Sequence, residues 1–116
     1  MTVHYLEVVT PNVDAVCAAY ADAHHVTFGA AVPELGGARL AELAGGGLLG
    51  VRAPLRDDES PVVRPYTLVD DLAVAVAAAE SAGAHVALAG MPLGDYGSCA
   101  IVILGGNELG FWAKAA

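Results

Sequence analysis

Two stretches of the chain repeat their apolar residues with the period of an α-helix. Each stretch has apolar side chains at positions i, i+3, i+4 and i+7 behind a residue that caps helices, Asn12 in the first and Asp71 in the second. The apolar positions are Val13, Val16, Cys17 and Tyr20 in the first stretch and Leu72, Ala75, Val76 and Ala79 in the second. The pattern predicts one helix from Asn12 to about His24 and another from Asp71 to Gly83, because glycine is typical of a helix C-terminus.

The remaining apolar runs are short, rich in valine and bounded by glycine or proline, which is typical of β-strands. In the first half they predict strands over residues 3–10, 26–33, 39–43 and 48–54. In the second half they predict strands over residues 62–69, 85–89, 98–104 and 108–113. The polar segment 55–61 separates the halves and predicts a surface linker.

The two halves repeat the same order of elements, which predicts a duplicated unit. Asn12 corresponds to Asp71, and the glycine-rich run 46–50 corresponds to the run 106–110. We therefore expect one α+β domain over residues 1–116, made of two βαβββ modules over about 1–54 and 62–116. The modules are expected to form a curved mixed β-sheet around a central cavity, with the helices packed outside.

Composition and charge remove several classes of partner. The chain has 5 Lys and Arg residues against 13 Asp and Glu residues, which gives a net charge of −8. So few basic residues argue against binding to nucleic acid or to an anionic membrane. Cys17 and Cys99 lack a CxxC partner and are predicted to be free, buried thiols. No apolar run has the length of a signal peptide or a membrane span, so we expect a cytoplasmic protein.

Three segments resemble the glyoxalase/bleomycin-resistance/extradiol-dioxygenase superfamily, also called vicinal oxygen chelate. They are Glu7-Val8-Val9-Thr10-Pro11-Asn12-Val13-Asp14, Leu68-Val69-Asp70-Asp71-Leu72 and Gly105-Gly106-Asn107-Glu108-Leu109-Gly110-Phe111-Trp112. The resemblance covers nearly the whole chain and implies the two-module fold. It also implies four metal-ligand positions on strands, which fall at Tyr5, Gly50, Arg64 and Gly110. None is a usual metal ligand, and arginine repels a cation, so we expect neither a metal nor another cofactor.

Strand side chains alternate between the two faces of a sheet, so residues two positions from the implied ligand positions share their face. This predicts an inner face that carries Tyr5, Glu7, Leu48, Arg52, Arg64, Tyr66, Glu108 and Trp112. Glu7 and Glu108 are the candidate catalytic residues, because a carboxylate can act as a general base. The candidate ligand-binding residues are Tyr5, Arg52, Arg64, Tyr66 and Trp112. The alternative is that the charged residues form only structural ion pairs and the aromatic residues only fill the core.

Four functions are compatible with this pattern. The first is a protein that binds a polar or aromatic small organic molecule without a metal, and the second is a metal-free isomerase, lyase or hydrolase. The second would act on a carbonyl compound and use Glu7 or Glu108 with Arg64. A metal-dependent lyase or dioxygenase, or a regulatory module with a ferredoxin-like fold, fits less well. A homodimer is expected, since both modules have strand edges to cover, and the modules pair within one chain or swap between two.

Overall fold

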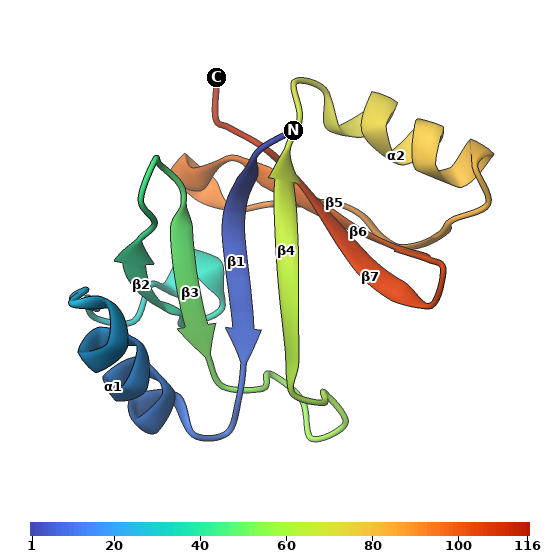
Figure 1. Cartoon of the computed structure of the whole chain (residues 1–116). Helices are drawn as coiled ribbons and strands as arrows, with labels where there is room; N and C mark the ends of the chain where they lie inside the picture. The colour runs from blue at the N-terminus through green and yellow to red at the C-terminus, as the bar shows by residue number, and fades with distance from the viewer. The chain divides into compact units, whose positions relative to one another are not determined.

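The computed structural model describes all residues 1–116 and divides the chain into two compact units. One unit is Tyr5–Val63, and the other is Arg64–Ala116 together with Met1–His4 (Figure 1). The first four residues therefore belong with the second half of the chain, although the sequence pattern places them in the first module. No helix of the chain is long and apolar enough to cross a membrane.

The unit Tyr5–Val63 is a three-stranded sheet covered by one helix. Its strands are β1 (Val3–Val9), β2 (Arg39–Glu42) and β3 (Leu48–Arg52), in the order β2-β3-β1. Strand β3 runs parallel to β1 and antiparallel to β2. Helix α1 (Val13–His24) packs against one face of this sheet, around a core of Val8, Cys17, Leu49 and Val51.

The second unit is a four-stranded sheet that also carries one helix. Its strands are β4 (Val62–Leu68), β5 (His85–Pro92), β6 (Ser98–Leu104) and β7 (Asn107–Ala113), in the order β4-β7-β6-β5. Strand β4 runs parallel to β7, and the other two pairs are antiparallel. Helix α2 (Leu72–Ser81) packs against β5, β6 and β7.

The predicted alternation is confirmed along β1 and β4. In β1, Leu6 and Val8 pack in the cluster with α1, whereas Tyr5 and Glu7 are buried on the other face. In β4, Arg64 and Tyr66 are buried while the intervening Pro65 is half-buried. No bulge interrupts the pairing of β1 with β3 or of β4 with β7, so successive side chains keep alternating between the two faces of the sheet.

The strand predicted over residues 26–33 is wrong. The segment has no regular structure except a single bridge between Val32 and Ala38, and it continues into a 3₁₀ helix, Pro33–Leu35. Gly29 donates its backbone N–H to the carbonyl of Leu40, but its neighbours do not continue the ladder. Glycine and alanine have a low preference for strands, and proline lacks an N–H donor, so the valine content alone did not determine a strand.

Two smaller predictions need correction. Strand β5 extends through Gly90 and Met91 to Pro92, with register shifts against β6, where the sequence predicted an irregular segment from Gly90. Asn12 stands at the N-cap position of α1 but makes no side-chain cap, whereas Asp71 accepts a hydrogen bond from the N–H of Val74. The expected duplication is therefore stronger in the order of elements than in their local details.

A tyrosine side chain covers a glycine on the neighbouring parallel strand in each unit. Gly110 lies directly opposite Tyr66, and a Cβ atom at Gly110 would meet Cγ of the Tyr66 ring at 2.6 Å. A Cβ atom at Gly50 would overlap the Tyr5 hydroxyl group and meet Cε1 of that ring at 2.9 Å. Both glycines are thus required by the close approach of an aromatic ring rather than by backbone conformation.

We expect Gly110→Ala to lower the free energy of unfolding by about 1–3 kcal/mol, because the added methyl group overpacks the Tyr66 ring. Urea denaturation measures this change. Gly29→Ala is the matched control, since a Cβ atom there would meet nothing within 4 Å, and it should change stability by less than about 0.5 kcal/mol. In a Tyr66→Ala background the cost of Gly110→Ala should shrink, and an unchanged cost would contradict the packing explanation.

Candidate functional site

Each unit buries an arginine on the strand face opposite its helix. In the unit Tyr5–Val63 this residue is Arg52, the last residue of β3, which is 6% exposed. Its Nε atom donates a hydrogen bond of 2.8 Å to Oε2 of Glu7, which is also 6% exposed. A guanidinium group and a carboxylate that leave water together compensate each other's desolvation only when their geometry is good, as it is here.

The second partner of Arg52 is Glu59, a residue that the sequence analysis did not select. Its two carboxylate oxygens accept hydrogen bonds from Nη1 (2.9 Å) and Nη2 (2.8 Å) of Arg52 in a bidentate pair. The backbone N–H of Leu55 also donates to Oε1 of Glu59 at 2.7 Å. Glu59 lies in the polar linker between β3 and β4, and a charged residue in a polar segment gives no sequence signal of burial.

These contacts shift the pKa values of both partners. Burial lowers the pKa of the Arg52 guanidinium, but the hydrogen bonds to Glu59 and Glu7 outweigh burial and raise it above its ordinary value. The hydrogen bond from Arg52 lowers the pKa of Glu59 to about 2, against an opposing effect of burial. Arg52 and Glu59 are therefore both charged at neutral pH.

The buried arginine of the second unit is Arg64 of β4, which pairs with Glu108 of β7. Its Nε and Nη2 atoms both donate to Oε2 of Glu108, at 3.0 and 2.7 Å. Its Nη1 atom lies 3.4 Å from the hydroxyl oxygen of Tyr66. The Glu108 side chain is 36% exposed, so one end of this ion pair is buried and the other reaches solvent.

Aromatic rings lie next to Arg64. Tyr66 and Trp112 meet edge to face with their ring centroids 5.7 Å apart, and the tilted ring of His4 lies with its centroid 5.6 Å from that of Trp112. The indole Nε1 of Trp112 donates to the carbonyl of Tyr96 at 2.8 Å, which fixes the ring. Burial lowers the pKa of His4, and Lys114 lowers it further, so the imidazole is neutral at pH 7.

The structure thus groups the predicted site residues into two sets. Glu7 and Arg52 meet in the unit Tyr5–Val63, where Tyr5 lies against Gly50, and Arg64, Tyr66, Glu108 and Trp112 gather in the second unit. The ion pairs expected under the structural alternative are present in both sets. The catalytic and ligand-binding roles of these residues stay predictions, because burial and pairing serve a binding site and a core equally well.

Two open grooves lie in the unit Tyr5–Val63, beside the irregular segment that replaces the predicted strand. The larger, of about 580 Å³, is lined by Val26, Thr27, Leu40, Ala41, Glu42 and Leu48. The smaller, of about 400 Å³, is lined by Asp14, Cys17, Ala18, Ala21, Val26, Thr27, Phe28 and Arg39. Leu48 is the one predicted inner-face residue that lines either of these two grooves, so these two grooves are separate from the buried arginine sets.

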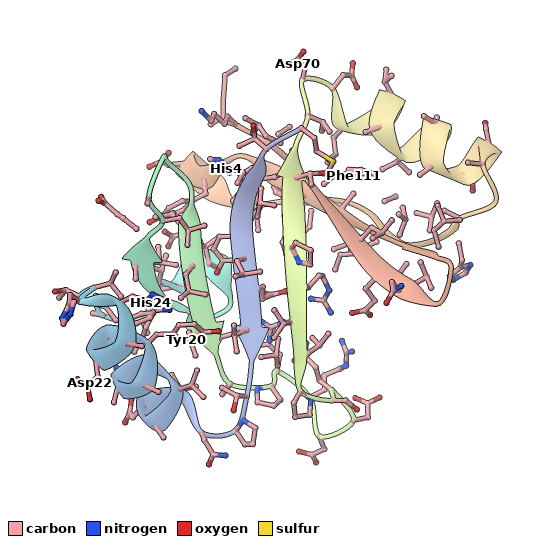
Figure 2. All side chains as sticks on the ribbon, viewed as in Figure 1. His4, Tyr20, Asp22, His24, Asp70 and Phe111 are labelled. Atoms are coloured by element: carbon pink, nitrogen blue, oxygen red, sulfur yellow. The ribbon has the colours of Figure 1, made fainter.

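Helix α1 ends in His24, which stacks on a tyrosine of the same helix. Tyr20 and His24 lie one turn apart on the helix, and their rings stack with centroids 6.0 Å apart (Figure 2). No group of three or more His, Cys, Asp or Glu residues in the chain is arranged to hold a metal ion.

The four implied metal-ligand positions do not fit a metal either. Tyrosine rings fill the space above Gly50 and Gly110, and Arg64 brings its own positive charge and its own carboxylate partner. Tyr5 occupies the remaining position with a buried side chain that lies against Gly50. A metal ion would need oxygen, nitrogen or thiolate donors where this chain places rings and a cation.

The Glu59 pair predicts a loss of stability in acid. Because the pKa of Glu59 falls from 4.5 to about 2 on folding, its contribution is complete above pH 4.5 and disappears as the pH falls towards 2. Glu59→Gln should therefore lower the free energy of unfolding at pH 7 by on the order of 2–3 kcal/mol, and the difference from the parent should shrink between pH 4.5 and pH 2. Urea denaturation at a series of pH values measures it. Asp58→Asn, on an exposed ion pair with Arg56, is the control, and an equal effect of both variants would contradict the assignment.

Neither a protein-family model nor a curated protein matches the sequence. Solved structures do match the fold. A hypothetical protein from Bacillus halodurans C-125 matches with a TM-score of 0.76 at 11% identity, over 99% of this chain and 95% of that one. Methylmalonyl-CoA epimerase from Mycobacterium tuberculosis matches with a TM-score of 0.73 at 14% identity, over 97% and 87%.

A variant of the Streptomyces coelicolor methylmalonyl-CoA epimerase, in complex with 2-nitronate-propionyl-CoA, matches with a TM-score of 0.68 at 17% identity, over 98% of this chain and 97% of that one. Identities this low describe the fold and not the reaction. The matches extend over nearly the whole length of each chain, as the sequence motifs implied. The chain therefore shares the fold of these solved structures, which include methylmalonyl-CoA epimerases.

Proposed function

We propose that this chain binds a small anionic or carbonyl-bearing organic molecule, without a metal, at the set formed by Arg64, Tyr66, Glu108 and Trp112. The observation that carries the proposal is the ion pair between buried Arg64 and half-exposed Glu108, at a strand position where related proteins hold a metal ion. A fixed guanidinium group supplies positive charge for an oxygen atom of a ligand. It supplies no open coordination position, so electrostatic binding is retained while metal chemistry is lost.

The arrangement of hydrogen bonds supports a ligand contact at this pair. Both donors of Arg64 converge on one oxygen of Glu108, Oε2, and Oε1 accepts none of the hydrogen bonds of the pair. A ligand carboxylate or carbonyl group is expected to take over one of the Arg64 donors, while Oε1 of Glu108 accepts from a ligand hydroxyl or amine. The neighbouring rings of Tyr66 and Trp112 offer apolar surface for the rest of the ligand.

A metal-free enzyme is the second candidate, and the exposure of Glu108 favours it. A carboxylate that is 36% exposed and held through a single oxygen has its other oxygen available to take a proton from a carbon next to a carbonyl group. Some structures that share the fold are named methylmalonyl-CoA epimerases. Removal of a proton next to a carbonyl group would also suit a carbonyl compound as the substrate of this chain. An isomerase that uses Glu108 as the base would need no metal.

The charges of the chain argue against coenzyme A as part of the ligand. The coenzyme carries several phosphate charges, which proteins bind with lysine and arginine. Of the 5 basic residues, Arg52 and Arg64 are paired with buried or half-buried carboxylates, and Arg39 and Arg56 pair with surface aspartates. With a net charge of −8, the chain favours a compact ligand with at most one negative group. The homodimer expected from the strand edges stays part of the proposal.

Arg64→Ala should weaken ligand binding by roughly 2–5 kcal/mol, because the change removes the anchor and leaves Glu108 without its partner. A thermal-shift screen against small oxo acids, aromatic carboxylates and aromatic antibiotics identifies the ligand, and isothermal titration measures its affinity for parent and variant. Arg56→Ala is the matched control, since Arg56 is exposed and pairs only with Asp58. Equal affinities of the parent and Arg64→Ala would contradict the proposed site.

We expect the purified, untagged protein to contain no stoichiometric zinc, iron, nickel, manganese or cobalt. The reason is that tyrosine rings and an arginine occupy the four implied ligand positions. Elemental analysis measures the metal content, and a thermal denaturation with and without a chelator tests whether any metal stabilises the fold. About one transition metal per chain, lost together with stability on chelation, would overturn the metal-free assignment.

A further inference from the structure

We propose that the terminal nitrogens of Arg52 form a carboxylate-binding site that the chain fills with its own Glu59, and that a ligand carboxylate enters by displacing this side chain. The displacement would free residues 56–61 from the sheet. The site lies in the unit Tyr5–Val63 and uses none of the residues of the proposed Arg64 site, namely Arg64, Tyr66, Glu108 and Trp112, so either proposal can fail without the other.

Three donors converge on the bound carboxylate. Nη1 and Nη2 of Arg52 hold the two oxygens of Glu59 in parallel, at 2.9 and 2.8 Å, and the Leu55 N–H donates to the first oxygen at 2.7 Å. This fork is the geometry with which arginine binds free carboxylates. The Glu59 side chain supplies only its carboxylate group to these contacts, so a separate carboxylate satisfies the same donors.

The site keeps its shape without Glu59, because other groups hold Arg52 in place. Glu7 accepts from Nε at 2.8 Å, and the carbonyl of Ala53 accepts from Nη1 at 3.2 Å. Gly36, at a φ of 68°, lets the backbone approach the arginine stem so closely that a Cβ atom there would lie 3.1 Å from Cδ of Arg52. Glu7 is also the charge partner that prevents the guanidinium from being buried alone when Glu59 leaves.

The segment that carries Glu59 has little else to hold it. Residues 55–61 belong to no helix or strand, and all of them except Glu59 are exposed, including Leu55 at 65%. A turn hydrogen bond joins the Glu59 N–H to the carbonyl of Arg56 at 3.1 Å, and the pair between Arg56 and Asp58 lies at the surface. Segments with few buried contacts open at low free energy, so the Glu59 carboxylate is the main attachment.

The geometry also selects the class of ligand. The fork and the Leu55 N–H fit a planar carboxylate on a flexible carbon chain, since Glu59 presents its own carboxylate from a methylene group. A tetrahedral anion matches this planar arrangement less well. The ligand class is therefore aliphatic monocarboxylates, of which acetate is the smallest convenient probe.

Acetate titration of the whole chain tests the proposal. Glu59→Ala should bind acetate at least about tenfold more tightly than the parent, because the parent's tethered carboxylate competes at a high effective concentration. The titration is followed by thermal shift and by NMR at constant ionic strength. Asp58→Ala, which removes a neighbouring exposed carboxylate, should bind acetate as weakly as the parent does. If Glu59→Ala is unfolded in chloride buffer, acetate should refold it.

Acetamide and chloride separate carboxylate binding from general solvent effects. Neither should stabilise Glu59→Ala as acetate does. Acetamide has the shape of acetate but no charge, and chloride has the charge but lacks the two coplanar oxygen atoms that the arginine binds. In the parent, acetate should also accelerate hydrogen exchange at the Glu59 amide, because the turn opens when its side chain leaves. Equal acetate affinities of the parent and Glu59→Ala, equal stabilisation by acetamide, or an unfolded variant that acetate does not restore would each overturn the proposal.

Discussion

The structure depends on pairing two arginines that β-strands carry into the interior. A guanidinium group does not lose its charge when it is buried, so each of these side chains requires a carboxylate in hydrogen-bonding geometry. Arg52 has Glu7 and Glu59, and Arg64 has Glu108. The requirement reaches beyond the sheet, because satisfying Arg52 brings Glu59 of the linker down onto β3 and thereby fixes the conformation of an otherwise exposed segment.

The strand positions at which the family resemblance implies metal ligands are filled by packed side chains in this chain. Tyrosine rings cover Gly50 and Gly110, and Arg64 is paired with Glu108. Each ring fits only because the glycine that it covers lacks a Cβ atom. Aromatic packing and an ion pair therefore occupy these positions.

The two units differ in one element of an otherwise similar order. In the unit Tyr5–Val63 the segment after α1 does not form a strand, and two shallow grooves lie beside it. In the second unit the corresponding segment forms β5, the long edge strand of a four-stranded sheet. In the unit Tyr5–Val63 the buried arginine pairs with a residue of the linker that follows β3. In the second unit the arginine of β4 pairs with a residue of β7.

Local pattern by itself determined the two helices, six of the seven strands to within a residue or two, and the alternation of side chains along β1 and β4. These features follow from periodicity, which neighbouring residues encode together, and so the burial of Glu7, Arg52, Arg64 and Tyr66 was predictable. Tertiary structure alone decided the rest. Residues 26–33 do not form a strand, because a strand requires hydrogen bonding to a neighbouring strand in addition to residues with a high β-propensity. The pairing of β5 with β6 set the full length of β5. The contact between Glu59 and Arg52 also came from the tertiary structure, because no periodicity in the linker indicates which of its residues is buried. The buried charge of Arg52 stabilises this pairing, and that charge lies outside the linker.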